Sequence, residues 1–287
     1  MDFAPAGPAT AVFTLRPAPA IFPRMSDFDF RFGGIARLFG VAALARLRAA
    51  HVCVVGVGGV GSWAVEALAR SGVGKLTLVD LDEVCVSNVN RQLHALDAEV
   101  GRAKVEVMAA RVRGINPECD VRATLDFFTE TSAASLLSTR YEFVVDAIDD
   151  IANKCRLIAL CREQQIPIVT CGAAGGRRDP TQVRVADLAL TTHDRLLTKA
   201  RDVLRKEFGF PLAGKPFGVE AVYSPEPPVY PSSTGGVCDR RESGAMKLNC
   251  DSGFGTATFV TGAFGFAAAA RVVQQIGAGG ARTAESA

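Results

Sequence analysis

The chain has 287 residues, of which 48% are hydrophobic and 22% are charged, and its formal net charge at pH 7 is +2. This length and composition predict a globular protein with one large hydrophobic core or two modest ones. A net charge this close to zero excludes nucleic-acid binding through bulk charge, so any contact with RNA must come from a local cluster of cations.

Residues 1–28 are rich in Ala, Pro and Phe and are expected to form a disordered leader. Pro17, Pro19 and Pro23 interrupt the apolar stretch that a secretory signal requires, so secretion is not expected. The eight cysteines include no Cys-x-x-Cys pair, which argues against a structural zinc site, and several of them lie in apolar segments. Reduced thiols of this kind are typical of a cytoplasmic protein.

Apolar strands and amphipathic helices alternate between residues 41 and 173. The expected helices are Val41–Ala49, Ser62–Ser71, Arg102–Ile115, Ser132–Ser138 and Ile151–Gln164, and the expected strands are His51–Val55, Lys75–Asp80, Asp120–Leu125, Phe143–Ala147 and Ile168–Ala173. This alternation predicts parallel strands joined by crossover helices. We therefore expect an α/β fold with a Rossmann-like, doubly wound and mainly parallel sheet in a core of residues 29–175.

The first strand leads into a glycine-rich turn. Gly56, Gly58 and Gly61 fit the G-x-G-x-x-G pattern, and Gly59 adds a further glycine within it. Asp80 stands at the end of the next strand, where a carboxylate can bind the hydroxyls of a ribose. The pattern predicts a nucleotide at a helix N-terminus and leaves two possibilities open, NAD for hydride transfer or ATP for cleavage.

The residues after Asp80 favour ATP. Asp82 begins a segment that contains Asn90 and Arg91, and Lys104 stands near the start of the next helix. Two cations near a phosphate chain suit phosphoryl or adenylyl transfer, in which negative charge builds up on oxygens, whereas hydride transfer has no such need.

Asp149 and Asp150 follow the strand Phe143–Ala147, at an edge of the sheet where this architecture binds its ligands. Mg²⁺ is commonly held through one or two carboxylates together with nucleotide phosphates, so these acids are candidate metal ligands. The alternative is that Asp149 only caps the helix that begins at Ile151.

Taken together, these motifs resemble the ubiquitin-activating and molybdopterin/thiamine adenylyltransferase superfamily over roughly residues 30–175. The matching features are Gly56-x-Gly-Gly-x-Gly61, Asp80, Ser87-Asn-x-Asn-Arg91-Gln, Gly101-x-x-Lys104 and Asp146-x-x-Asp149. The resemblance implies an ATP site. In it the glycines present N–H groups to phosphate, Asp80 binds ribose, Arg91 and Lys104 stabilise the phosphates, Asp149 carries Mg²⁺, and Asp82 and Asn90 also contact the nucleotide.

Within the superfamily the chain is most similar to the branch that modifies tRNA. The supporting segments are Cys85-Val-Ser-Asn-Val-Asn-Arg91-Gln-Leu-His94, Ile115-Asn-Pro-Glu-Cys119, Val229-Tyr-Pro231 and Ser252-Gly-Phe-Gly-Thr-Ala257. This resemblance implies ATP-dependent dehydration of threonylcarbamoyladenosine in tRNA, through an acyl-adenylate, to a cyclic product.

Three other functions stay open at this point. The first is adenylation of the C-terminus of a small ubiquitin-like sulfur-carrier protein, although relatives that do this often carry a zinc-binding cysteine pair that this chain lacks. The second is a non-catalytic binding scaffold, and the third is an NAD-dependent oxidoreductase.

Residues 176–277 are expected to form a C-terminal extension with tRNA and dimer surfaces. A strand is predicted at Val183–Asp187, a charged helix at Asp194–Phe208, a further strand within Val219–Tyr230, and a mobile loop over residues 232–252. Residues 254–270 contain no charged residue, and we expect an apolar, buried helix there in preference to a membrane segment. Residues 278–287 are expected to be a flexible tail.

A cluster of cations in the extension is the candidate RNA surface, with a solvated helix face as the alternative. Its members are Arg177, Arg178, Arg184, Arg195, Lys199, Arg201, Arg205 and Lys206. Arg37 resembles the superfamily arginine that reaches a neighbouring subunit's nucleotide, which implies a homodimer; a solvated helix arginine is the alternative.

Two further residues, Cys238 and His94, are also candidates for a functional role. Cys238 could accept sulfur from a cysteine desulfurase partner, although the sequence places no base beside it. His94 lies next to the phosphate-binding segment, and a structural hydrogen bond is the preferred role over proton transfer.

Overall fold

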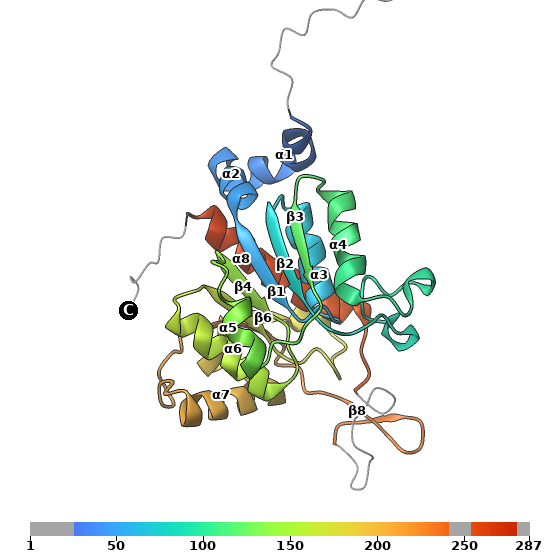
Figure 1. Cartoon of the computed structure of the whole chain (residues 1–287). Coiled ribbons are helices and arrows are strands. Elements are labelled where there is room, and N and C mark those ends of the chain that lie inside the picture. Colours follow the sequence, from blue (N-terminus) through green and yellow to red (C-terminus); the bar gives the residue numbers. More distant parts are fainter. Residues whose placement is uncertain (1–25, 241–253, 280–287) are drawn as a thin grey trace, which may run out of the picture.

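The computed structural model describes residues 26–240 and 254–279, which are built around one seven-stranded sheet (Figure 1). The strands are β1 (His51–Val55), β2 (Lys75–Val79), β3 (Asp120–Thr124), β4 (Phe143–Asp146), β5 (Ile168–Cys171), β6 (Arg184–Asp187) and β7 (Glu220–Tyr223). Their order across the sheet is β3-β2-β1-β4-β5-β7-β6, and all neighbours are parallel except β6 and β7. The predicted α/β fold with a mainly parallel sheet is confirmed.

Helices cover both faces of this sheet. The helices are α1 (Asp27–Phe39), α2 (Val41–Ala49), α3 (Gly61–Arg70), α4 (Lys104–Ile115), α5 (Glu130–Leu136), α6 (Ile151–Glu163), α7 (Arg195–Glu207) and α8 (Thr258–Gly277). One hydrophobic core joins α3, α4 and α8 to the sheet, and a second joins α5, α6 and α7 to its other face. The molecule therefore has three layers.

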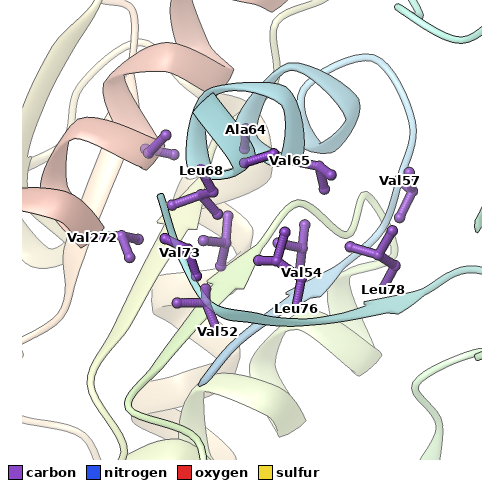
Figure 2. Packing of buried hydrophobic residues seen from close by; sticks show 14 of the residues in the cluster. Val52, Val54, Val57, Ala64, Val65, Leu68, Val73, Leu76, Leu78 and Val272 are labelled. Atoms are coloured by element: carbon purple, nitrogen blue, oxygen red, sulfur yellow. The ribbon is translucent and has the colours of Figure 1, made fainter. Parts of the chain in front are cut away.

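Successive side chains along each strand point alternately into one core and then the other. In β1, Val52 and Val54 point to the α3 face, whereas Cys53 and Val55 point to the α6 face. Figure 2 shows how β1, β2, α3 and α8 meet in the first core, through residues that include Val52, Val54, Ala64, Val65, Leu68, Leu76, Leu78 and Val272. Strands buried on both faces read as continuous apolar runs, which is why they were predictable.

The sheet has a switch point between β1 and β4. From β1 the chain continues to β2 and β3 on one side, while from β4 it continues to β5 on the other. β1 and β4 pair directly, with Val55 opposite Asp146. Because the loops that leave these two strands turn to opposite faces, a crevice opens at their carboxyl ends, where this architecture binds ligands.

The helix α1 was not predicted. Ser26 caps it by accepting a hydrogen bond from the Asp29 N–H (3.1 Å), and Phe28 and Phe32 pack against Leu44 of α2. The structured part of the chain thus begins inside the predicted leader of residues 1–28. The remainder of that leader, residues 241–252 of the predicted loop and residues 280–287 of the predicted tail lie outside the described residues.

The C-terminal extension completes the same sheet. β6 and β7 extend it beyond β5, and β8 (Tyr230–Pro231) and β9 (Val237–Cys238) form a hairpin where the predicted loop begins. α8 buries Val260, Phe264 and Val272 against α3 and the sheet. None of the helices within residues 26–240 and 254–279 combines the length and apolar character that crossing a bilayer requires.

Candidate nucleotide-binding site

A cavity of about 740 Å³ lies at the carboxyl ends of β1, β2, β4 and β5. Its wall includes the glycine turn after β1, the Asp80 end of β2, Lys104 of α4 and the Asp149 loop after β4. Thr261 of α8 closes one side. The structure therefore brings most of the predicted nucleotide-binding residues into one place.

The glycines of the turn have two different roles. Gly56 has a φ of +88° and its N–H donates to the Val79 carbonyl (2.9 Å), while a Cβ there would lie 2.8 Å from the Ala147 carbonyl oxygen. A Cβ on Gly61 would overlap the carbonyl of Gly56, so both positions require glycine for the backbone to fold. Gly58 and Gly59 line the cavity and have more room, the nearest atoms to a Cβ being 4.0 Å and 3.3 Å away.

The N-terminus of α3 faces this turn. Its N-cap residue, Val60, makes no side-chain capping hydrogen bond, and the helix starts at Gly61. The first N–H groups of an α-helix have no partner inside the helix, and the helix dipole places partial positive charge there. An uncapped N-terminus behind a glycine turn is suited to bind phosphate.

Asp80 connects the glycine turn to the end of β2. Its carboxylate is buried and accepts hydrogen bonds from the N–H groups of Val57 (2.7 Å) and Asp82 (2.9 Å). Burial raises the pKa of the Asp80 carboxyl above its usual value, and the nearby charge of Lys104 opposes this rise. Each oxygen of an ionised carboxylate can accept a second hydrogen bond, so Asp80 retains capacity for a ligand hydroxyl.

Lys104, the first residue of α4, is a buried cation in the cavity wall. Its side chain is 6% exposed and its Nζ lies 2.7 Å from Oδ2 of Asp82, whose own side chain is 55% exposed. The backbone N–H of Lys104 also donates to the Asp82 carbonyl (3.0 Å). Asp82 thus forms an ion pair with the buried ammonium group from the exposed side of the cavity. An anionic ligand in the cavity could contact the same ammonium group.

Arg91 places a second cation at the same cavity. Its Nη1 donates to the Ser87 carbonyl (2.6 Å) and to Oδ1 of Asn90 (3.0 Å), which holds the guanidinium against its own loop. Within the described residues, Nε and Nη2 make no hydrogen bond and are available to phosphate oxygens. Arg91 and Lys104 flank the same cavity as the glycine turn.

Asn90 occupies a different place from the one predicted. It does not line the cavity; its side-chain amide donates to the Thr256 carbonyl (2.9 Å), and its own carbonyl accepts from the Thr258 hydroxyl (2.6 Å). Asn88, for which no role was predicted, is buried, lines the cavity and accepts from the Cys85 N–H (3.0 Å). Two asparagines in one motif gave no signal in sequence to distinguish them.

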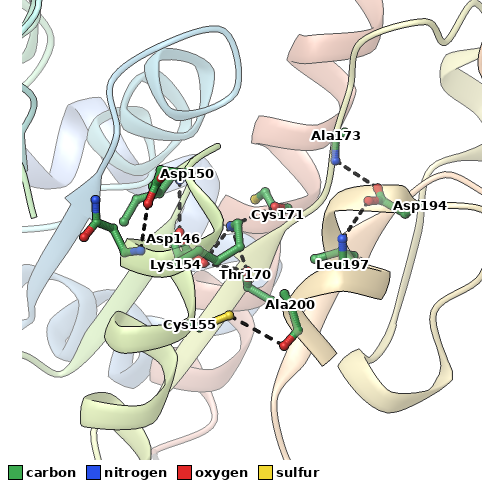
Figure 3. A network of polar contacts seen from close by, with 12 residues as sticks. Asp146, Asp150, Lys154, Cys155, Thr170, Cys171, Ala173, Asp194, Leu197 and Ala200 are labelled. Carbon is green, nitrogen blue, oxygen red and sulfur yellow. Dashed lines mark hydrogen bonds and ion pairs between the residues drawn. The ribbon is translucent and has the colours of Figure 1, made fainter. Parts of the chain in front are cut away.

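Asp149 is free to act on a ligand because its neighbour caps the helix. Asp150 caps α6 by accepting from the Asn153 N–H (2.9 Å), so the alternative that Asp149 is the cap is wrong (Figure 3). Asp149 is exposed and lines the cavity, and its carboxylate makes no hydrogen bond within the described part of the chain.

A buried ion pair fixes the loop that carries Asp149. Asp146 and Lys154 are fully buried, their side chains lie 2.7 Å apart, and Thr170 donates to the same carboxylate (2.6 Å), as Figure 3 shows. The other Asp146 oxygen accepts from the Ile148 N–H (3.0 Å). Separating the pair would leave a buried charge without a partner, which is costly. The pair therefore keeps Asp146, and the loop bonded to it, in one conformation.

The side chains that the structure describes do not by themselves form a complete metal cage. Among the described residues no three His, Cys, Asp or Glu side chains gather in a way that could hold a metal ion. A lone exposed carboxylate at the cavity, Asp149, fits an ion such as Mg²⁺ only if nucleotide phosphates supply further ligands, as is common for this ion.

An aromatic wall of the cavity was also not foreseen. Phe127 and Phe128 follow β3 and line the cavity beside Thr129, and Phe127 is 47% exposed. An exposed ring in a nucleotide-sized cavity provides a flat apolar surface for a base. The sequence feature that could have predicted this wall is the Phe-Phe pair directly after a predicted strand.

Two other predicted residues lie away from this cavity. Arg37 is exposed on α1, which packs on Gly72 just before β2 and therefore at the amino edge of the sheet, opposite the cavity. Cys238 lies half-buried in β9, where its thiol donates to the Arg240 carbonyl (2.9 Å). Neither side chain lines the cavity.

His94 does not make the structural hydrogen bond that was expected. It is buried, and neither ring nitrogen has a hydrogen-bond partner within residues 26–240 and 254–279. Burial, aided by the charge of Lys104, lowers the pKa of His94 to about 4. The ring is therefore neutral at pH 7.

The candidate RNA cluster is smaller than predicted. Arg177 is only 4% exposed and donates to the His193 carbonyl (2.7 Å), so it cannot contact a polyanion at the surface. Arg201 donates to the Thr191 hydroxyl, and Arg205 donates to the Pro211 carbonyl (3.2 Å). The cations that remain exposed are Arg178, Arg184, Arg195, Lys199 and Lys206.

Comparison with known proteins places these features in a family context. Residues 34–276 match the ThiF family. The chain is 51% identical to the tRNA threonylcarbamoyladenosine dehydratase of Escherichia coli over 255 residues, which cover 88% of this chain and 95% of that protein. It is 47% identical to the enzyme of the same name from Haemophilus influenzae over 257 residues, covering 89% and 97%.

A solved structure agrees with the sequence comparison. The crystal structure of the E. coli tRNA N6-threonylcarbamoyladenosine dehydratase in complex with ATP superposes with a TM-score of 0.80 at 47% identity. The match covers 91% of this chain and 100% of that one. A second crystal structure of the E. coli enzyme contains AMP.

Proposed function

The chain belongs to the ThiF family, and we propose that it catalyses the ATP-dependent dehydration of threonylcarbamoyladenosine in tRNA. The observation that carries the proposal is the convergence of the glycine turn, Arg91, Lys104 and Asp149 on one cavity. The high identity to dehydratases over almost their whole length supports the choice of substrate.

The first chemical step activates a poor electrophile. An oxygen of the threonyl carboxylate attacks the α-phosphorus of ATP, the bond to the bridging oxygen breaks, and pyrophosphate leaves. Negative charge grows on the nonbridging oxygens and on the departing pyrophosphate. We assign the stabilisation of this charge to Arg91, Lys104 and the N–H groups at the start of α3, and ribose binding to Asp80.

The second step closes a ring within the modification. A carbamoyl nitrogen or oxygen attacks the activated carbonyl carbon, loses its proton, and expels AMP, which keeps one former carboxylate oxygen. The net change in the tRNA is the loss of one water. No covalent protein nucleophile is needed, because a nucleophile in the same side group already has a high effective concentration.

We also propose that Asp149 is the carboxylate that would hold Mg²⁺ when the nucleotide is bound. When bound, such an ion neutralises charge on the phosphate oxygens. The chain's own contribution is positional, since the buried Asp146–Lys154 pair fixes the Asp149 loop and Asp150 is occupied as the cap of α6.

Replacement of the two key side chains tests the proposal. Lys104→Ala and Asp149→Asn are each expected to slow AMP formation from ATP and threonylcarbamoylated tRNA by at least about 100-fold, the size of effect seen when a transition-state partner is lost. Lys215→Ala, an exposed lysine outside the cavity, is the control and should retain the wild-type rate. Near-normal rates in the Lys104 or Asp149 variant would overturn these assignments.

A further inference from the structure

One side chain of the C-terminal helix contacts both the glycine turn and the loop that carries Arg91, which are two parts of the cavity wall. Thr261 of α8 is 2% exposed and lines the cavity. Its methyl carbon would lie 3.3 Å from a Cβ placed on Gly59, so it packs directly against the glycine turn. Its hydroxyl lies 3.0 Å from the Arg91 carbonyl, nearer than the carbonyls of its own helix at 3.2 and 3.4 Å.

The Arg91 carbonyl accepts a second hydrogen bond, from a residue of α3. Nε1 of Trp63, on α3, donates to it at 3.2 Å, and the Trp63 ring packs edge-on against Phe266 of α8, with ring centroids 5.7 Å apart. The backbone of Arg91 is therefore held between two helices. A carbonyl oxygen has two lone pairs, so Trp63 and Thr261 together satisfy it.

The contact between these helices leaves little freedom for α8 to shift. A Cβ on Gly265 would lie only 2.5 Å from the Val60 carbonyl oxygen and 2.7 Å from Cβ of Trp63. At the start of α8, Asn90 and Thr258 add a further hydrogen bond of 2.6 Å between the Arg91 loop and the helix. The helix thus holds the Arg91 loop at a defined distance from the N-terminus of α3.

We propose that Thr261 is a positioning residue for adenylyl transfer, which sets the separation between the glycine turn and the Arg91 guanidinium. The guanidinium follows its backbone, because Nη1 is bonded to the Ser87 carbonyl and the Asn90 side chain of the same loop. A displaced loop would move this cation away from the reacting phosphate, while Asp80, Lys104 and the glycine N–H groups would still bind the nucleotide. This inference rests on the proposed function.

The isosteric variant Thr261→Val removes the hydroxyl and keeps the shape. We expect the rate of AMP formation at saturating ATP to fall roughly tenfold, because small displacements of catalytic groups are costly. The ATP dissociation constant should change less than about threefold, since most nucleotide contacts remain. Thr261→Ser, which keeps the hydroxyl, should recover most of the rate even if the valine variant loses stability.

A matched control and a double-mutant cycle separate positioning from general stability. Thr77 is also 2% exposed and its hydroxyl bonds to His51 (2.9 Å), outside the cavity, so Thr77→Val should keep the wild-type rate. In an Arg91→Ala background, Thr261→Val should have no further effect on the rate, because the group that it positions is absent.

Additive losses in that cycle, or an equally slow Thr261→Ser, would overturn the role of Thr261 while leaving the proposed function intact. A wild-type protein that forms no AMP from ATP and modified tRNA would instead overturn the proposed function itself, and the positioning role with it.

Discussion

Lys104 is a buried ammonium group whose partner, Asp82, is largely exposed. An ion pair of this kind holds the cation in place without a ligand and allows an incoming phosphate to share or replace the carboxylate. It explains how a buried positive charge is held in the cavity wall before a ligand binds.

Removing the Asp82 charge tests this interpretation. In Asp82→Asn, Lys104 loses its partner, so we expect the free protein to be less stable by about 1 kcal/mol, a modest value because the pair is partly exposed to solvent. Added ATP should then raise the thermal midpoint more than it does in the wild type. A smaller shift would show instead that Asp82 is itself needed to bind ATP.

His94 makes stability depend on pH. Its pKa is lowered to about 4 in the folded protein, so the unfolded chain binds an extra proton between pH 6.5 and pH 4. The stability that the buried neutral ring permits is therefore present above pH 6.5 and lost as the pH falls towards 4, by at most about 3 kcal/mol.

Denaturant titrations across this range check the prediction. The unfolding free energy of the wild type should fall more between pH 7 and pH 4.5 than that of the His94→Gln variant, because the variant lacks the buried imidazole. Parallel pH profiles for the two proteins would contradict it.

At the scale of elements, the alternating strands and helices were predictable because β1, β2 and β4 are buried on both faces and carry apolar runs. The start of α1 was not, because its cap, Ser26, follows a Pro-rich stretch and Gly33-Gly34 weakens the helical pattern. Local sequence determines only the helix propensity of a segment. Whether a segment of weak propensity forms a helix depends on whether the fold provides a surface for it to pack against.

The same limit applies to the site. Gly56, Gly61, Asp80 and Lys104 follow from a motif because backbone geometry and strand ends determine their place. Contacts between distant segments, such as Asn90 with Thr256, could not be read from the sequence. They depend on where α8 returns to the sheet.

The packing of α8 on α3 has a direct test. Gly265→Ala would push a methyl group against the Val60 carbonyl, so we expect a loss of about 1–3 kcal/mol of stability and weaker ATP binding. Gly262→Ala, one turn earlier on the same helix, meets nothing closer than 3.7 Å and is expected to be neutral or slightly stabilising. Thermal unfolding with and without ATP compares the two; equal behaviour would contradict the close contact.

At the scale of the whole molecule, the sheet separates Arg37 from the cavity of its own subunit. α1 covers the amino edge of the sheet, while the cavity opens at the carboxyl edge (Figure 1). If Arg37 contacts a nucleotide, that nucleotide must belong to another subunit. We therefore propose a homodimer in which each α1 completes the neighbouring site.

Mixing two inactive variants tests this assembly. Arg37→Ala and Lys104→Ala should each be slow alone, but their co-refolded mixture should recover about a quarter of the wild-type rate, since half of the dimers are mixed and each holds one complete site. Full activity of Arg37→Ala alone would identify Arg37 as a solvated helix residue. If both variants are slow alone and their mixture shows no recovery, a site shared between subunits is contradicted.

The most direct test of the account is the mass of the product. The protein is incubated with ATP, Mg²⁺ and threonylcarbamoylated tRNA, with Lys104→Ala as the inactive control, and the digested nucleosides are analysed by mass spectrometry. We predict that the modified adenosine loses the mass of one water while AMP and pyrophosphate accumulate in equal amounts. If the wild-type protein binds ATP but leaves the mass of the modified nucleoside unchanged, the proposed function is contradicted.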